Sequence, residues 1–229
     1  MSPDAFAYRG EMTLIDLSHP IEHGMITYPG LPGPVITDYL TREASRDRYE
    51  AGTEFQIGEI QMVANTGTYL DTPAHRFSDG FDLSGLSLER VADLDAVCIA
   101  AGGAIQPDII DDHDVAGRAV LFSTGWDRHW RTDKYGDQSH PYLSAALAAR
   151  LVDERVGLVG IDSVNIDDTT GGSRPVHSTL LAAGIPIVEH LTGLNPLVEA
   201  SFRFFAVPPR VKGMGTFPVR AFALLEGTS

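Results

Sequence analysis

The sequence predicts a single α/β domain, residues 1–229, with a mixed, strand-rich core. The strongest observation is a strand–helix–strand unit, in which a helix at 145–152 separates apolar strands at 118–123 and 156–161 and favours a parallel pair. In addition, expected strands outnumber expected helices along the chain. No internal repeat, low-complexity tract or linker divides the sequence, so one domain is expected.

The composition is typical of a globular protein and argues against nucleic-acid-binding and membrane-spanning classes. The chain of 229 residues is 43% hydrophobic and 21% charged, ordinary values for a globular protein that buries its own core. A net charge of −14 repels phosphate backbones, so no nucleic-acid partner is expected. No segment has the length of a transmembrane helix, and the N-terminus lacks the features of a signal peptide. One cysteine excludes an internal disulfide framework and, with the missing signal, predicts a cytoplasmic protein.

The N-terminal third begins with a strand at 12–17, where apolar residues alternate until Ser18-His19-Pro20 ends the pattern. Residues 24–34 are rich in glycine and proline and predict a long loop of the functional or mobile kind. The highly charged segment 41–52 predicts a surface excursion, and 56–63 then reads as a strand.

The remaining elements follow from capping signals and apolar runs. Residues 86–94 predict a short helix with Ser87 as its N-cap. The alanine- and leucine-rich helix at 145–152 has Ser144 as a natural N-cap. The other expected strands are residues 95–100, 185–191, 202–207 and 219–225.

Residues 65–75 carry the densest group of polar side chains in the sequence. Asn65, Tyr69, Asp71 and His75 share odd numbering, and in an extended chain residues two apart line one face. We therefore expect these side chains to converge on a cavity. The alternative is a structural turn, in which Asp71 closes an Asx-type turn before Pro73 and the histidine bonds a backbone carbonyl.

A second group supports the cavity. Glu189, twelve residues after His177, interrupts an apolar run, and a buried carboxylate is costly unless it is paired, protonated or bound to metal. The alternative is an edge strand with Glu189 in water. Ile185 and Ile187 share its parity, so Glu189 is expected to point inward and His190 to the opposite face.

Other candidates remain open between a site and ordinary structure. Asp162, at the end of an apolar strand, either lines a site or caps the strand-to-loop junction. Trp126 and Trp130 either wall an apolar pocket or fill the core, and the same alternatives hold for Tyr28 and Phe77. Cys98 stands in an apolar strand, so an inert buried thiol is expected.

Residues 65–75 contain Gly67, Thr68, Asp71, Pro73 and His75 at the spacing of a known signature, His-x-Gly-Thr-His-x-Asp-x-Pro-x-His. The chain thereby resembles the cyclase-like metal-dependent hydrolases, which include bacterial kynurenine formamidase and isatin hydrolase. The resemblance extends over nearly the whole length, through residues 15–20, 124–126, 140–144, 160–163 and 177–191.

The resemblance implies a swivelling β/β/α domain, a homodimer or higher homo-oligomer, and a divalent metal. It places Asp71, His177 and Glu189 near the metal and makes His75 the acid–base. Asn65 and Tyr69 stand where the signature has its first two histidines. The asparagine offers a weaker carbonyl oxygen, and a neutral tyrosine is a poor ligand.

One divalent ion, Mn²⁺, Mg²⁺ or Zn²⁺, is therefore expected on Asp71, His177 and Glu189, with Asn65 as a further ligand. The predicted activity is hydrolysis of a carbon–nitrogen bond in a small amide, either N-formyl or cyclic. His75 is expected to move the proton, and Tyr69 to donate a hydrogen bond to the oxyanion. The alternatives are a biosynthetic enzyme closing or opening a ring in a small aromatic metabolite, and a non-catalytic binder with a decayed metal site.

Overall fold

The computed structural model describes residues 12–225, so the prediction about the N-terminal residues 1–6 lies outside them. Within that range no helix is long and apolar enough to cross a membrane. The helices are α1 (Arg42–Ser45), α2 (Ala145–Asp153) and α3 (Pro175–Ala182), and the strands are β1 (Thr13–Asp16), β2 (Val35–Leu40), β3 (Ile57–Gln61), β4 (Tyr69–Asp71), β5 (Leu94–Ala100), β6 (Ala104–Ile105), β7 (Ala119–Ser123), β8 (Tyr142–Leu143), β9 (Leu158–Ile161), β10 (Ile187–Glu189), β11 (Phe202–Phe205), β12 (Thr216–Pro218) and β13 (Phe222–Leu225).

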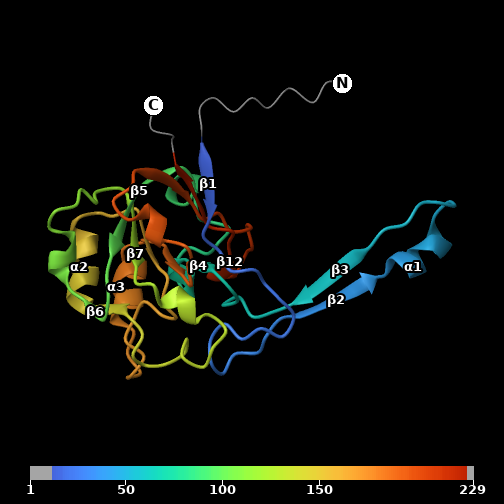
Figure 1. The fold of residues 1–229 in the computed structure, drawn as a ribbon, viewed down its shortest axis with the longest axis horizontal. Helices are drawn as coiled ribbons and strands as arrows, with labels where there is room; N and C mark the ends of the chain where they lie inside the picture. Colours follow the sequence, from blue (N-terminus) through green and yellow to red (C-terminus); the bar gives the residue numbers. More distant parts are fainter. Residues whose placement is uncertain (1–11, 226–229) are drawn as a thin grey trace.

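One large mixed sheet forms the centre of the body (Figure 1). Its nine strands run in the order β1-β13-β11-β5-β7-β9-β10-β4-β12. The four central strands, β5, β7, β9 and β10, are parallel to one another, and antiparallel strands extend the sheet on both sides. The predicted strand–helix–strand unit is confirmed, because β7 and β9 pair in parallel and α2 connects them. The mixed, strand-rich α/β class is therefore confirmed; organisation as one domain stays a prediction.

Two apolar layers cover the two faces of this sheet. On β7, Val120 and Phe122 belong to the layer that includes α2 and α3, whereas Leu121 belongs to the opposite layer. Because successive side chains of a strand alternate between faces, a fully apolar strand is needed when both faces are covered. All five residues of β7 are indeed buried.

Helices α2 and α3 lie side by side against one face (Figure 1). The hydroxyl of Ser144 accepts a hydrogen bond from the backbone amide of Leu147, so the predicted N-cap is confirmed. The sequence analysis did not predict α3, although Pro175 at its first turn and Gly184 with φ of +73° after it are terminal signals.

Strand β4 is the element that positions the polar residues. It lies between β10 and β12 and runs antiparallel to both. The register pairs Tyr69 with Glu189 and Asp71 with Thr216. Side chains of directly opposed residues share one face of a sheet, so segments more than a hundred residues apart deliver polar groups to the same place.

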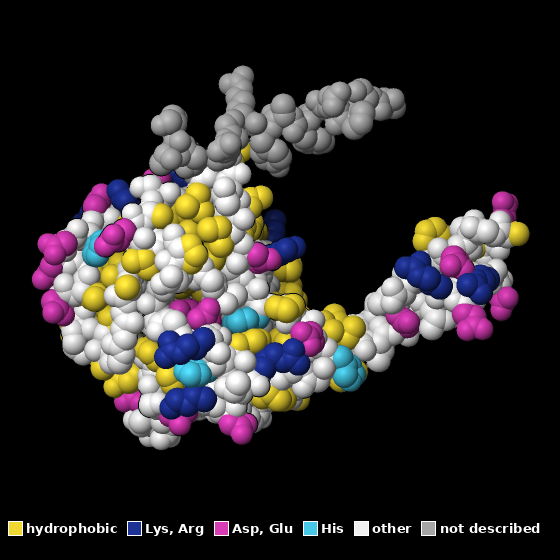
Figure 2. Space-filling model, viewed as in Figure 1, with side chains coloured by type: hydrophobic (Ala, Val, Ile, Leu, Met, Phe, Trp, Pro, Cys, Tyr) yellow, Lys and Arg dark blue, Asp and Glu magenta, His cyan; other side chains and the backbone are white. Residues whose placement is uncertain are grey.

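A long hairpin projects from the body and is called the arm here; it comprises residues 35–61, including β2, α1 and β3 (Figure 1). The charged segment predicted as a surface excursion forms its tip, which Figure 2 shows as a projection with several charged side chains. Large apolar side chains are exposed along the arm: Val35, Ile36, Tyr39, Tyr49, Phe55, Ile57 and Ile60.

Three local expectations need correction. The short helix predicted at 86–94 is only a 3-10 turn at Leu88–Arg90, since Ser87 makes no side-chain cap and β5 already begins at Leu94. The strands β2, β6, β8 and β12 were not predicted. His190 does not point away from Glu189, because its φ of +58° ends the strand alternation and leaves its ring buried beside Tyr69.

We expect the substitution Ser144→Ala to lower the free energy of unfolding by about 1 kcal/mol, since it removes the acceptor for an otherwise unpaired amide of α2. Urea unfolding followed by circular dichroism measures the loss. Ser87→Ala is the matched control, because Ser87 makes no such cap, and it should change stability by less than ~0.5 kcal/mol. Equal losses in the two variants would contradict the capping role.

Candidate active site

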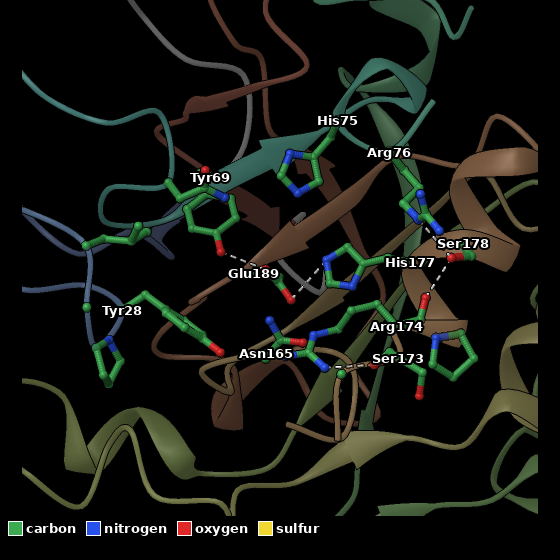
Figure 3. Close-up of a pocket in the computed structure, with 16 residues that line it drawn as sticks. Tyr28, Tyr69, His75, Arg76, Asn165, Ser173, Arg174, His177, Ser178 and Glu189 are labelled. Atoms are coloured by element: carbon green, nitrogen blue, oxygen red, sulfur yellow. Dashed lines mark hydrogen bonds and ion pairs between the residues drawn. The ribbon is translucent and has the colours of Figure 1, made fainter. Parts of the chain in front are cut away.

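A cavity of about 720 Å³ opens beside β4, β10 and the first turn of α3 (Figure 3). Five of the six predicted site residues line it, and the sixth, Asp71, is fully buried next to it. The lining consists of Tyr28, Pro29, Gly30, Leu31, Asn65, Tyr69, His75, Arg76, Asn165, Gly172, Ser173, Arg174, Pro175, His177, Ser178 and Glu189. The predicted convergence of residues 65–75 with His177 and Glu189 is therefore present in the fold.

The imidazole of His177, in the first turn of α3, is the centre of this site. Its Nε2 lies 3.7 Å from Asp71 Oδ2 and 3.6 Å from Glu189 Oε1. Its Nδ1 lies 2.6 Å from Asp167 Oδ2. Asp167 also accepts the backbone amides of Val176 and His177, so one carboxylate both caps α3 and orients the ring.

These buried charges determine the electrostatics. Burial alone would lower the pKa of His177, but the facing carboxylates of Glu189, Asp167 and Asp71 raise it well above its ordinary value. Burial likewise opposes ionisation of Glu189, yet His177 holds the pKa of this carboxyl at about 2. Three buried carboxyl groups face one imidazole, so even a protonated His177 leaves excess negative charge in the site.

The arrangement suits a cation. Asp71 Oδ2 is buried and has no hydrogen-bond partner in the described part of the chain, which is costly for a carboxylate oxygen. Ligand atoms of Asp71, His75 and His177 all lie within 4.8 Å of one another. A carboxylate on the far nitrogen of a histidine, as Asp167 is here, is the usual support for a metal-binding imidazole. The residues present therefore fit a divalent ion.

The hydroxyl of a threonine connects His75 to Asp71 by hydrogen bonds. The hydroxyl of Thr216, on β12, hydrogen-bonds to Asp71 Oδ1 and also lies 2.7 Å from Nδ1 of His75. The His75 side chain is about one-third exposed and borders the cavity, whereas Asp71 is fully buried. The chain of contacts therefore runs from the buried carboxylate to an accessible imidazole.

The hydroxyl of Tyr69 is engaged by neighbouring buried side chains. Its hydroxyl donates to Glu189 Oε2 at 2.7 Å, and His190 Nε2 lies 3.2 Å from the Tyr69 hydroxyl oxygen. Burial lowers the pKa of His190 to about 4, despite the opposing charge of Glu189. The neutral ring accordingly accepts the hydroxyl proton of Tyr135 at Nδ1, over 2.8 Å. The single Tyr69 proton is thus engaged by Glu189 and does not point freely into the cavity.

Of the remaining candidates, Tyr28 lines the cavity, whereas Asp162, the two tryptophans and Cys98 have structural roles. Asp162 accepts the backbone amides of Thr124 and Gly125, so it caps the end of β7, and burial raises its pKa to about 6. Trp126 and Trp130 pack with Tyr135 and Val164 rather than line the cavity. Burial, with a further contribution from Asp162, raises the pKa of the Cys98 thiol to about 12, as expected of an inert cysteine.

Sequence reasoning missed Asp167, Thr216 and His190. Asp167 lies eight residues before the first residue of α3, so its contacts with the amides of that helix depend on the fold of the intervening loop and have no local sequence signal. Thr216 is 141 residues from His75 and follows an inconspicuous Gly-Met-Gly segment, so nothing local marks it.

The fold and this cluster define an α/β protein whose cavity has a carboxylate–histidine site suited to a cation. The family model described as "Putative cyclase" matches residues 15–168. The chain belongs to this family, and the predicted family is confirmed.

Curated relatives agree. The kynurenine formamidase of Geobacillus thermodenitrificans is 30% identical over 218 residues, covering 90% of this chain and 95% of the relative. The kynurenine formamidase of Bacillus mycoides is 26% identical over 215 residues, with the same coverage. These relatives support the predicted enzyme class, a metal-dependent amide hydrolase acting on non-peptide carbon–nitrogen bonds.

Solved structures confirm the fold. Isatin hydrolase A from Labrenzia aggregata superposes with a TM-score of 0.81 at 19% identity, covering 94% of each chain. A potential metal-dependent hydrolase with cyclase activity has a TM-score of 0.76 at 24% identity, covering 95% of this chain and all of the other. The body of the protein is therefore the one shared by this group of structures.

Proposed function

We propose that this protein hydrolyses the carbon–nitrogen bond of a small amide, N-formyl or cyclic, with the help of one divalent metal ion. The observation that carries the proposal is His177, buried at the edge of the cavity and facing three carboxyl groups, with the accessible His75 beside it. A cavity of about 720 Å³ has the size of a small-molecule site.

The residues that would hold the ion are Asp71 through Oδ2, His177 through Nε2 and Glu189 through Oε1, with Asn65 as a further oxygen donor. When bound, a divalent ion supplies Lewis-acid polarisation of an amide carbonyl. The donor set, with more oxygen than nitrogen, is compatible with Mn²⁺, Zn²⁺ or Mg²⁺. The absence of histidine at positions 65 and 69 favours one ion over two.

His75 then performs the proton transfers. Its imidazole accepts a proton from the attacking water as the new carbon–oxygen bond forms, and it returns that proton to the leaving nitrogen as the carbon–nitrogen bond breaks. The products are a carboxylic acid and an amine. His75 is placed for this role because its ring borders the cavity and lies near His177, with ring centroids 6.1 Å apart.

For Tyr69 we propose a supporting role in place of the oxyanion donor expected earlier. Its proton is engaged by Glu189, and donation to a substrate oxygen would require that hydrogen bond to break. The tyrosine instead fixes the orientation of Glu189, because Oε2 takes the tyrosine proton and Oε1 takes the amide of Ile166.

The ring-opening alternative breaks the same type of bond and uses the same groups, so a cyclic amide belongs in any substrate panel. A decayed binding protein is disfavoured by the structure of the site. A protein without metal would gain nothing from an unpaired buried carboxylate oxygen on Asp71, or from Asp167 orienting His177.

We expect the purified protein to hold about one divalent ion per chain, by elemental analysis of protein purified without chelator. Asp71→Asn should lose that ion, because it replaces a carboxylate whose buried Oδ2 has no hydrogen-bond partner among residues 12–225. Asp79→Asn removes the same charge at an exposed position and should retain the ion. A metal-free wild type, or full occupancy in Asp71→Asn, would contradict the proposed site.

The substitution His75→Ala should lower kcat on the best substrate of an N-formyl and cyclic amide panel by roughly 10²- to 10⁴-fold, the usual contribution of a general acid–base. Metal content should stay near the wild-type value. His113→Ala, at an exposed histidine outside the cavity, is the control. Unchanged turnover in His75→Ala would show that the mechanism is wrong.

We also propose that the protein is a homo-oligomer, with the arm packing on a second copy of the chain. An isolated two-stranded hairpin is marginally stable in water, and this one exposes apolar side chains from both of its strands. Two-fold symmetry would let each arm cover the other subunit and lose its exposed apolar surface in the same contact.

Replacing Ile36, Tyr39 and Ile60 together with serine should shift the mass measured by light scattering toward that of the monomer, 24.7 kDa. Leu88→Ser is the matched control, since Leu88 is as exposed but lies outside the arm. A wild-type monomer, or an oligomer that survives the triple substitution, would exclude the arm as the interface.

A further inference from the structure

The geometry points to Thr216 as a positioning residue that fixes the tautomer of His75, so that Nδ1 carries the proton and Nε2 is left free as the base. The catalytic consequence rests on the proposed hydrolase function. The tautomer itself does not, because it follows from hydrogen-bonding capacity alone.

The direction of each hydrogen bond follows from the atoms available. The Asp71 carboxylate can only accept, and the Thr216 hydroxyl has one proton. Thr216 therefore donates to Asp71 Oδ1, and its oxygen must accept from Nδ1 of His75, 2.7 Å away. A neutral imidazole has one proton, which this bond places on Nδ1. Nε2 is then unprotonated and makes no hydrogen bond within residues 12–225.

The backbone around residue 215 lets the Thr216 hydroxyl come close to the His75 imidazole. Thr216 lies opposite Asp71 in the β12–β4 pair. Gly215, the residue before it, lies against the turn that carries His75, so closely that an added Cβ would sit 2.2 Å from the His75 amide nitrogen and 2.6 Å from Cα. Any larger residue would separate β12 from this turn, and only glycine lets the hydroxyl reach the imidazole.

The same contacts separate two roles for His75. Its ligand atoms lie within 4.8 Å of those of Asp71 and His177, so distance alone would permit it to bind the ion. Nδ1, the atom 3.6 Å from Asp71 Oδ1, is the one that Thr216 engages. His75 is thus held beside the cation site as a base by a hydroxyl that itself bonds a proposed ligand.

The tautomer is tested in the full-length protein by ¹⁵N NMR of histidine-labelled samples, with the His75 signals assigned from His75→Gln. We expect protonated Nδ1 and unprotonated Nε2 in the wild type, and loss of that preference in Thr216→Val. Titration with Zn²⁺ alone should leave the His75 nitrogens free of metal coordination. A protonated Nε2 in the wild type, or coordination of His75 by zinc, would overturn the inference.

Kinetics provide the second test, at saturating metal. Thr216→Val keeps the shape but removes the hydroxyl, and kcat should fall roughly 10- to 100-fold with KM little changed. Thr216→Ser restores the hydroxyl and should recover activity to within about threefold, since the same hydrogen bonds can form. Thr72→Val is the matched control, because the Thr72 hydroxyl also joins β4 to the β12 segment, through the Gly215 carbonyl, without contacting His75.

The two tests separate this inference from the proposed function. If no amide is hydrolysed but the wild type shows the Nδ1 tautomer and Thr216→Val loses it, the hydrolase proposal fails and the positioning role stands. Equal activity of Thr216→Val and Thr216→Ser, or an equal loss in Thr72→Val, would show that the hydroxyl has no specific role.

Discussion

The buried carboxyl groups around His177 are the constraint on which the site depends. Asp71, Glu189 and Asp167 are almost fully buried, and each would be costly there without a positive partner. The Asp167 carboxylate is stabilised by the backbone amides at the start of α3. The imidazole of His177 faces all three carboxyl groups and stabilises them further. The charge that is left over is the physical reason for proposing a cation, independently of any relative.

Tyr69 has contacts in the site that a histidine at the same position would not make. Tyr69 links Glu189 to His190, as Thr216 links Asp71 to His75. In both cases an imidazole N–H donates to a hydroxyl, and the hydroxyl donates to a carboxylate proposed to hold the ion. The two series of hydrogen bonds differ in the exposure of their histidines. His190 is buried against Tyr135, whereas His75 borders the cavity.

The sequence predicted those parts of the protein that local patterns encode. Most strands, the α2 helix with its Ser144 cap and the inward carboxylate of Glu189 follow from alternation, propensity and the cost of burying charge. The orientation of His190 was predicted wrongly, because a single residue with positive φ reverses the face expected from parity. The role of Thr216 and the register of β12 could not be predicted, because they depend on pairing across more than 140 residues, which no local pattern specifies.

The position of β12 at the edge of the sheet affects the order in which the enzyme loses activity and structure during unfolding. This strand has three residues and lies at the edge of the sheet, held by β4 on one side alone. Short edge elements open at a lower free energy than the interior of a fold. Detachment of β12 would remove Thr216 from His75 while the apolar layers on both faces of the central strands remain packed. Loss of catalytic competence should therefore precede global unfolding, because an edge strand carries the hydroxyl that positions His75.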